Sequence, residues 1–287
     1  MLPKKFFSIL SSISSHHSSK SANYKLIKEL CLKLFENSDF KSKENKEILF
    51  AEFGEIIFPF YSFGKITTID LFGIDELIIF AFYLANKNKY KNVLDIGGNL
   101  GLHSILMSIL NWQVRVYEPD PLHLDILKKN IFLNKCSKNI EVFPKAVLNK
   151  KDKLEFTRVL GNTTGSHLSG MKTNPYGKLD KFVVETSDIK DIIQGIDFIK
   201  LDAEGAEVDI ITSISRENLT KTDIMLEVSS EKNANIIFEY INDYEDINMF
   251  SQLNNWEHVT SISHMPSSHR EGSLFISSNL KMNFVYE

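Results

Sequence analysis

Short apolar runs alternate with helix-patterned stretches along the chain from Asn92 onward. The runs have the length and β-branched content of buried strands, and apolar residues in the stretches between them return every three or four positions. Such alternation predicts a mostly parallel sheet covered by helices on both faces. We therefore expect an α/β fold with a seven-stranded sheet, whose strands are residues 93–96, 114–118, 140–147, 198–202, 224–228, a weaker strand near 259, and 274–277.

The chain before this alternation follows other patterns. Apolar spacing predicts a helix over residues 24–36, and residues 54–72 combine β-branched and aromatic side chains around Gly64, which favours a hairpin. We expect a helical and hairpin extension over residues 1–90 and the main domain over residues 91–287. Aromatic residues of this hairpin could line a substrate cleft or merely cover one edge of the main sheet; they are Phe58, Phe60, Tyr61 and Phe63.

Three further features shape the expected fold. Asp75 is a plausible N-cap for a helix over residues 75–86. After Glu118, Asp120 suits an N-cap and Pro121 suits the first helical position. Residues 150–189 interrupt the strand–helix alternation with two β-rich runs around a glycine- and threonine-rich loop, which predicts an inserted β-hairpin.

Composition and charge narrow the class of protein. Charged residues make up 24% of the chain, and the formal net charge of −4 gives no electrostatic reason to expect a nucleic-acid partner. Cys31 and Cys136 show no metal-binding spacing and fit a reducing compartment. No apolar run approaches the ~20 residues of a membrane span, so we expect a cytoplasmic protein without integral membrane association. His16 and His17 lie in a serine-rich stretch and are expected to be solvated.

A glycine-rich turn follows the first strand of the main domain. Gly97, Gly98 and Gly101 leave the backbone uncovered just before a helix begins, so a ligand can contact the main chain. Roughly twenty residues later the next strand ends at Glu118, where Rossmann-like folds place the carboxylate that binds a ribose. The turn and the acid together predict a nucleoside site.

The spacing of this turn differs from that of the dinucleotide fingerprint. Asn99 and Leu102 stand where the second and third glycines of that fingerprint belong, and Gly101 comes one position early. A ligand without a pyrophosphate, such as S-adenosylmethionine, needs close main-chain approach for its amino-acid portion and a carboxylate for its ribose. The sequence offers both features.

Four blocks of this sequence resemble the FkbM-type S-adenosylmethionine-dependent methyltransferases. They are VLDIGGNLGLHS (93–104), VYEPDPLHLDILKKNIFLN (116–134), PKAV (144–147) and FIKLDAEGAE (198–207). The resemblance covers roughly half of the chain, from residue 92 to about 229, and implies a Rossmann-like methyltransferase fold with S-adenosylmethionine as cofactor. The commonest turn in this family has alanine where Gly98 stands, a departure that we expect to leave binding undisturbed.

The resemblance also implies roles for individual residues. The turn would surround the methionine portion of the ligand, while Asp95 would brace the turn or meet the ligand amine. Glu118 would bind the ribose hydroxyls, although it could instead cap the next helix, and Ala146 with its neighbours would flank the adenine. The residues expected to bind the cofactor are Asp95, Gly97, Gly98, Asn99, Gly101, Glu118, Pro119 and Ala146.

Carboxylates at the ends of later strands are candidates for catalysis. Asp202 ends the fourth core strand and should point into the crevice where open α/β folds bind ligands. Methyl transfer to oxygen requires the proton of the acceptor hydroxyl to leave to a base or to become more acidic on a metal, and Asp202 and Glu204 could serve either way. With Glu227 they could hold a divalent cation, which remains an option that we do not predict. Glu207 is expected only to favour a helix N-terminus.

Histidine is the other candidate base, because its pKa lies near neutrality. His264 lies in a polar loop before the last strand, a place where loops commonly select the acceptor, and is a hypothetical base on that ground alone. His103 follows the glycine turn and could face the ligand or pack at the start of the helix.

These observations lead to an expected function. The chain would be an S-adenosylmethionine-dependent O-methyltransferase, and by the family resemblance its acceptor would be a sugar hydroxyl of a bacterial surface glycan or of the nucleotide-sugar precursor, as in polysaccharide biosynthesis. Two alternatives stay open. The chain could methylate a small secondary metabolite, or it could be a binding module that kept the nucleoside pocket without turnover.

Overall fold

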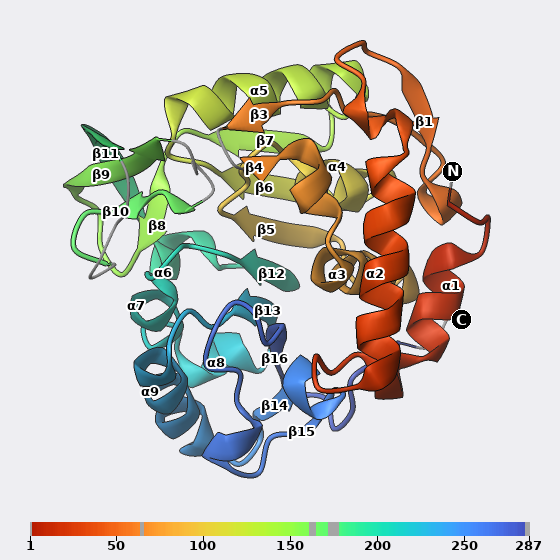
Figure 1. The fold of residues 1–287 in the computed structure, drawn as a ribbon. Helices are drawn as coiled ribbons and strands as arrows, with labels where there is room; N and C mark the ends of the chain where they lie inside the picture. The colour runs from red at the N-terminus through yellow and green to blue at the C-terminus, as the bar shows by residue number, and fades with distance from the viewer. Residues whose placement is uncertain (1, 64–65, 161–164, 172–177, 285–287) are drawn as a thin grey trace.

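The computed structural model describes residues 2–63, 66–160, 165–171 and 178–284. Its centre is a mixed eight-stranded sheet with the order β15-β14-β16-β13-β12-β5-β6-β7 (Figure 1). The five strands from β13 to β7 run parallel, whereas β16 is antiparallel to both of its neighbours. The strands are β5 (Asn92–Ile96), β6 (Gln113–Tyr117), β7 (Ile140–Phe143), β12 (Phe198–Leu201), β13 (Asp223–Glu227), β14 (Asn248–Ser251), β15 (Glu257–His258) and β16 (Ser273–Ser277).

The α/β class and the mostly parallel sheet are confirmed, with two corrections to the strands. The predicted strand 140–147 is wrong as a single strand: it ends at Phe143 and resumes as β8 (Ala146–Leu148), which belongs to another sheet. Pro144 lies in the break, and proline has no N–H to donate to a strand ladder. The strand β14 was missed because it is only four residues long and depends on pairing with β16, so the sheet has eight strands where seven were expected.

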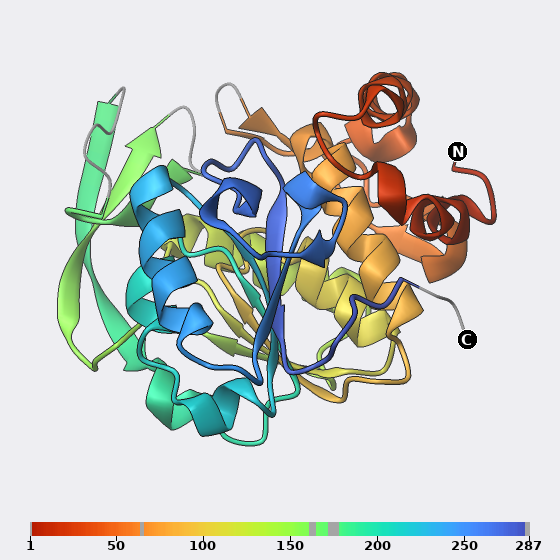
Figure 2. The ribbon, with the colours of Figure 1, turned by 90° about the horizontal axis from the view of Figure 1, so that it is seen from below.

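Helices cover both faces of the sheet because adjacent strand residues point to opposite sides (Figure 2). Val93 faces the core shared with α3 and α4, whereas Leu94 faces the core shared with α7 and α9. The first face is covered by α1 (Phe6–Ser12), α2 (Ala22–Glu36), α3 (Ile74–Ala85), α4 (Leu102–Ile109) and α5 (Pro121–Leu133). The second face is covered by α6 (Ile189–Ile192), α7 (Glu207–Ile211), α8 (Arg216–Leu219) and α9 (Glu231–Asn242).

The N-terminal segment packs onto α3 through a cluster of phenylalanines. Phe35 stacks on Phe72 with ring centroids 4.8 Å apart, and Phe50 contacts both Phe7 and Phe80 edge-on. The short strands here are β1 (Glu47–Leu49), β2 (Glu55–Ile57), β3 (Ser62–Phe63) and β4 (Ile66–Thr67). Pairing of β3 with β4 confirms the predicted hairpin, whose Gly64 lies outside the described residues. The domain boundary at residue 90 remains a prediction.

Two side chains in this region lie differently from the expectation. Gly73 is the N-cap of α3, so Asp75 is not; its carboxylate accepts hydrogen bonds from the Tyr24 hydroxyl (2.8 Å) and from Gln252 Nε2 (2.6 Å). His17 is 1% exposed, so the expected solvation is wrong for this residue. Its ring nitrogens contact the carbonyl of Leu10 and Nε1 of Trp256, contacts from distant segments that local composition does not reveal.

The insertion predicted over residues 150–189 is confirmed as a hairpin. Strand β9 (Lys153–Leu160) pairs antiparallel with β11 (Lys178–Asp188) and with β10 (His167–Leu168). The end of β11 then pairs in parallel with β8, which gives a four-stranded sheet of order β10-β9-β11-β8. This second sheet stands at one side of the main sheet, near the carboxyl ends of its parallel strands (Figure 1).

Candidate functional site

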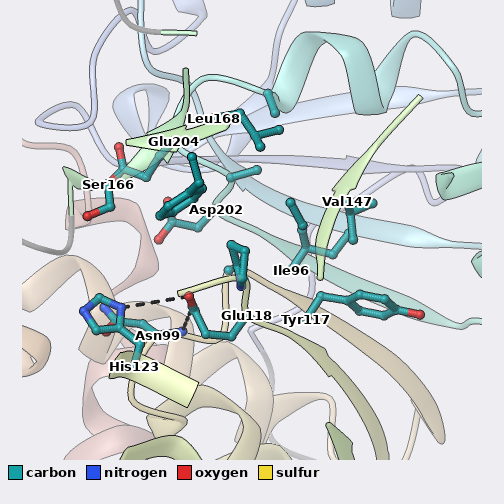
Figure 3. Close-up of a pocket in the computed structure, with 16 residues that line it drawn as sticks. Ile96, Asn99, Tyr117, Glu118, His123, Val147, Ser166, Leu168, Asp202 and Glu204 are labelled. Atoms are coloured by element: carbon teal, nitrogen blue, oxygen red, sulfur yellow. Dashed lines mark hydrogen bonds and ion pairs between the residues drawn. The ribbon is translucent and has the colours of Figure 1, made fainter. Parts of the chain in front are cut away.

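A cavity of about 600 Å³, open to solvent, lies where β5, β6 and β12 end. Figure 3 shows that its walls come from widely separated segments: the glycine turn, the end of β6, the start of β8, the inserted hairpin and the turn after β12. Its lining includes five residues predicted for the cofactor and two predicted for catalysis, namely Gly97, Asn99, Glu118, Pro119, Ala146, Asp202 and Glu204.

The glycine turn has its conformation because two strand ends meet at Gly97. This residue has a φ of +83°, and a Cβ there would lie 1.9 Å from the carbonyl oxygen of Asp202. Asn99 also has a positive φ, of +48°, and Gly101, at +86°, is the N-cap of α4. Since positive φ favours glycine, the spacing of this turn reflects backbone geometry as well as ligand access.

At Gly98 the space is limited by side chains and not by backbone. Its Cβ would lie 2.2 Å from Cγ2 of Val116 and 3.1 Å from Cδ1 of Leu127, so the side chain of Val116 occupies the space that an alanine methyl would need. The glycine at this position is therefore matched to the valine on the neighbouring strand. Gly98 and Gly101 shape the turn from behind and are not among the residues that line the cavity.

Glu118 ties the end of β6 to the turn. Its carboxylate accepts a hydrogen bond from the backbone N–H of Asn99 (2.7 Å) and another from that of Asp120 (2.8 Å). The residue is 5% exposed, and this burial raises the pKa of Glu118 to about 8, although both hydrogen bonds oppose the shift. The α5 helix is capped by Asp120, which accepts from the N–H of Leu122, so Glu118 is left to face the cavity.

The rest of this wall is apolar. Ile96, Tyr117 and Val147 come from the strand ends, and Phe156 and Leu168 come from the inserted hairpin. A flat aromatic base fits such a surface, while the carboxylate of Glu118 offers acceptors for a diol. Two buried acceptor atoms near the turn, Oδ1 of Asp95 and Oδ1 of Asn99, receive no hydrogen bond from the described residues. The site therefore fits a ligand that carries an aromatic base, a diol and further donors.

A cluster of charged side chains borders the opposite side of the cavity. Nζ of Lys200 lies 3.4 Å from Oδ2 of Asp202 and 3.4 Å from the carbonyl oxygen of Gly97. Burial alone would lower the pKa of Lys200, but the charges of nearby carboxylates, that of Asp202 first, raise it above its ordinary value. Burial and the charges of Asp202 and Glu76 hold the pKa of Glu227 well above its ordinary value. One lysine cation thus faces several acids at the edge of the cavity.

The comparison with known families settles the class of protein. Residues 95–258 match the model described as the methyltransferase FkbM domain, which is more than half of the chain. This chain belongs to the FkbM methyltransferase family. The expected enzyme class and the Rossmann-like methyltransferase fold are therefore confirmed, and the matched residues contain both the glycine turn and Asp202.

The individual proteins that this FkbM chain resembles share little sequence identity with it. The methyltransferase sdnD of Sordaria araneosa is 25% identical over an alignment 167 residues long. The match covers 47% of this chain and 64% of that protein, which is less than two thirds of its length. Among solved structures, the O-methyltransferase from Bacillus cereus in complex with SAH is 14% identical, with a TM-score of 0.39 over 69% of this chain and 78% of that one. The O-methyltransferase TomG from Streptomyces achromogenes is 10% identical, with a TM-score of 0.38 over 69% and 77%.

The other predicted residues of this FkbM chain lie around the cavity or away from it. Asp95 is fully buried beneath the turn, where its Oδ2 accepts from the Ser104 hydroxyl at 2.5 Å. His103 packs at the start of α4, with Nδ1 2.8 Å from the Tyr83 hydroxyl and Nε2 2.9 Å from Oε2 of Glu76. His264 is not brought to the cavity: it borders a separate surface hollow beside the segment between α1 and α2.

The two glutamates after Asp202 have different positions. Glu204 has a φ of +52° in the turn after β12 and lines the cavity. Glu207 begins α7, is 1% exposed, and accepts hydrogen bonds from the N–H groups of Gly205 and Ala203, as expected for a structural residue. Within the described ranges, no helix is long and apolar enough to span a membrane, and no group of three or more His, Cys, Asp or Glu side chains is placed to hold a metal ion.

Several residues of this site were not found from the sequence. Phe156 and Leu168 come from the inserted hairpin, and their alternation with polar neighbours indicated strands without relating them to the turn. His123 lines the cavity from α5, and its Nδ1 lies 4.0 Å from Oε1 of Glu118 (Figure 3). Lys200 lies two positions before Asp202 and therefore on the same side of its strand, which was an available signal.

Proposed function

We propose that this chain is an S-adenosylmethionine-dependent O-methyltransferase whose acceptor is a sugar hydroxyl of a bacterial surface glycan or of its nucleotide-sugar precursor. The observation that carries the donor assignment is the contact between Glu118 and the glycine turn: a buried carboxylate, held by the N–H of Asn99, faces a cavity with an apolar wall. Family membership supports the reaction class. The glycan acceptor rests on the resemblance to the family alone.

Three sets of residues contact three different parts of the donor: the ribose, the base and the amino-acid portion. Glu118 accepts hydrogen bonds from the ribose hydroxyls, because its carboxylate oxygens have acceptor capacity beyond the two backbone donors. The apolar wall that includes Val147 and Phe156 contacts the base. The turn around Gly97 and Asn99 takes the amino-acid portion, for which the buried Oδ1 of Asn99 is a ready acceptor.

Chemistry takes place on the side of the cavity bordered by Asp202. When bound, S-adenosylmethionine supplies the methyl group, which passes from sulfur to the acceptor oxygen and leaves S-adenosylhomocysteine. Asp202 accepts the proton of the acceptor hydroxyl as the new bond forms, and water then takes that proton. Lys200 keeps Asp202 in place and balances its charge, and Glu204 lines the approach to it. His264 has no part in the proposed step, because it borders a different hollow.

Calorimetric titration with S-adenosylmethionine and S-adenosylhomocysteine tests the donor site. Transfer of a radiolabelled methyl group is then measured with three acceptor classes: neutral oligosaccharides, nucleotide sugars and phenolic small molecules. Transfer to either sugar class supports the proposal, whereas transfer only to phenols points to a secondary metabolite. Binding without transfer to any class points to a binding module, and no binding at millimolar ligand would falsify the donor assignment.

A pair of aspartate variants tests the catalytic assignment. Asp202→Asn should lower kcat at least about a hundredfold, as expected for the loss of a general base, and should leave the affinity for S-adenosylhomocysteine within a few fold. Asp243→Asn, at an exposed position after α9, is the matched control and should leave both unchanged. Equal activity of the two variants would remove Asp202 from the mechanism.

A further inference from the structure

The inserted hairpin supplies part of the lining of the donor cavity. Phe156 on β9 and Leu168 on β10 both line that cavity. The two residues are directly paired across the strands, and Phe182 on β11 is the partner of Phe156 on its other side. Residues paired in this way share one face of a sheet, so a single face of the hairpin looks toward the cavity.

Arg158 lies on the same face of β9, two positions after Phe156. Its Nε and Nη2 donate hydrogen bonds to the two carboxylate oxygens of Asp120, at 2.7 and 2.5 Å. The side chains of Arg158 and Asp120 are 14% and 1% exposed, so this two-point ion pair is largely shielded from water. It joins the hairpin to the loop between β6 and α5.

Two further contacts fix the direction of the guanidinium. Nη1 of Arg158 donates to Asp180 on β11 at 2.9 Å, and the guanidinium carbon lies 4.7 Å from the ring centroid of Phe182. Arg158 is therefore held by its own hairpin on one side and by the main domain on the other. A planar guanidinium can satisfy all these partners at once, whereas a lysine ammonium cannot reproduce the two-point contact.

The partner of Arg158 is connected directly to the ribose carboxylate. The backbone N–H of Asp120 donates to Oε1 of Glu118, and its side chain also caps α5 through the N–H of Leu122. Burial alone would raise the pKa of Asp120, and the hydrogen bonds from Arg158 are the first cause that lowers it. A displacement of Arg158 therefore affects both the apolar wall on the hairpin and the loop that carries Glu118.

We propose that Arg158 is a positioning residue that holds the inserted hairpin as a wall of the nucleoside end of the donor cavity, through its ion pair with Asp120. This inference rests on the proposed function and adds to it that the insertion, not only the main sheet, determines affinity for the nucleoside. Arg158 itself is not among the residues that line the cavity, so its effect is transmitted through Phe156 and Asp120.

The test uses Arg158→Met and Arg158→Lys, with adenosine and S-adenosylhomocysteine as probes in calorimetry. Arg158→Met should raise the Kd of both ligands by the same factor, at least about tenfold, because the nucleoside is the part that they share. Arg158→Lys should recover only part of this loss. Arg216→Met is the matched control, because Arg216 also pairs with an aspartate, Asp246, but at an exposed position, and it should change neither Kd by more than about twofold.

Two measurements separate positioning from simple loss of structure. Hydrogen exchange should show faster exchange of the β9 amides in Arg158→Met than in Arg216→Met, with the other strands of the main sheet unchanged. Where an acceptor is known, KM for S-adenosylmethionine should rise while kcat is retained. Should Arg158→Met not fold, Phe156→Ala, which leaves the ion pair intact, is expected to raise the Kd of both probes in the same way.

The outcomes distinguish this inference from the proposed function. If the wild-type chain binds neither probe, the proposed function fails, and hydrogen exchange alone then decides whether Arg158 holds the hairpin. If the wild type binds and folded Arg158→Met binds both probes equally well, the inference is overturned while the proposed function stands. A loss confined to S-adenosylhomocysteine, with adenosine unaffected, would also overturn it, because the wall would then not act on the nucleoside.

Discussion

Substitution of Gly97 by alanine should damage both the fold and the donor site. The new Cβ would lie 1.9 Å from the carbonyl oxygen of Asp202, far inside the ~3.5 Å at which carbon atoms pack. Neither partner can rotate away, because both are backbone and the N–H of Asp202 is bonded to the carbonyl of Ile96. The positive φ of +83° adds about 1 kcal/mol for any residue with a Cβ. Overpacking of this kind costs about 3 kcal/mol or more.

A second glycine separates these two contributions. Gly195 has a φ of +72°, but nothing lies within 4 Å of the position that its Cβ would take. Gly195→Ala should therefore cost about 1 kcal/mol from the backbone alone. Thermal unfolding should show a decrease in Tm of about 10 °C for Gly97→Ala and of about 3 °C for Gly195→Ala, at roughly 3 °C per kcal/mol for a chain of this size.

The functional readout of this pair is the Kd of S-adenosylhomocysteine. Folded Gly97→Ala should bind at least about tenfold more weakly, because the turn and the end of β12 must separate to accommodate the methyl group. Gly195→Ala should bind like the wild type. Equal losses of stability in the two variants, or unchanged binding by Gly97→Ala, would refute the claim that contact between these two strand ends builds the site.

Three other predictions concern single contacts. Gly98→Ala should destabilise the fold by about 1–3 kcal/mol in chemical denaturation, and adding Val116→Ala should recover much of that loss, because the methyl group fills the vacated space. The folded-state pKa of Glu118, about 8, exceeds its ordinary 4.5, so the stability that this group contributes is fully present below pH 4.5 and is lost as pH rises from there through 8; Glu118→Gln should flatten that part of the pH–stability curve. Since a diol favours the ionised carboxylate, wild-type affinity for S-adenosylhomocysteine should also rise with pH up to about 8, unlike that of Glu118→Gln. Lys200→Met should lower kcat for methyl transfer, because Asp202 then loses the ammonium group that lies 3.4 Å from its carboxylate and holds it in place; an unchanged kcat would contradict this role.

The donor side could be predicted from sequence because its signals are local. The turn from Gly97 to Gly101 needs particular φ values within a few residues, and Glu118 follows at the length of one strand–helix–strand unit. Parallel strands then bring their carboxyl ends to the same edge, so Asp202 could be expected beside the turn from the sequence alone. Each of these positions follows from the order of the strands along the chain.

The remaining walls depend on contacts between distant segments. Arg158 and Asp120 are 38 positions apart, and nothing in the hairpin sequence indicates that this arginine reaches the loop after β6. Burial is equally hard to predict from the sequence: His17 was expected to be solvated, yet its ring nitrogens contact Trp256 and Leu10. In each case a charged or polar side chain can be buried because a partner from elsewhere in the chain forms a hydrogen bond with it. Local composition does not indicate that partner.

His264 and Asp202 differ in two properties that a general base needs, basicity and position beside the donor. By intrinsic pKa, a histidine is the better general base at neutral pH, and the loop of His264 lies in the usual region for acceptor selection. Methyl transfer, however, requires the base beside an oxygen already aligned with the donor, so proximity to the donor cavity outweighs basicity. Asp202 satisfies this condition through the direct backbone contact between its carbonyl and Gly97, whereas His264 borders another hollow. A carboxylate is the weaker base in solution, but the ion pair with Lys200 holds that of Asp202 beside the cavity, so the proposed mechanism depends on position first and on basicity second.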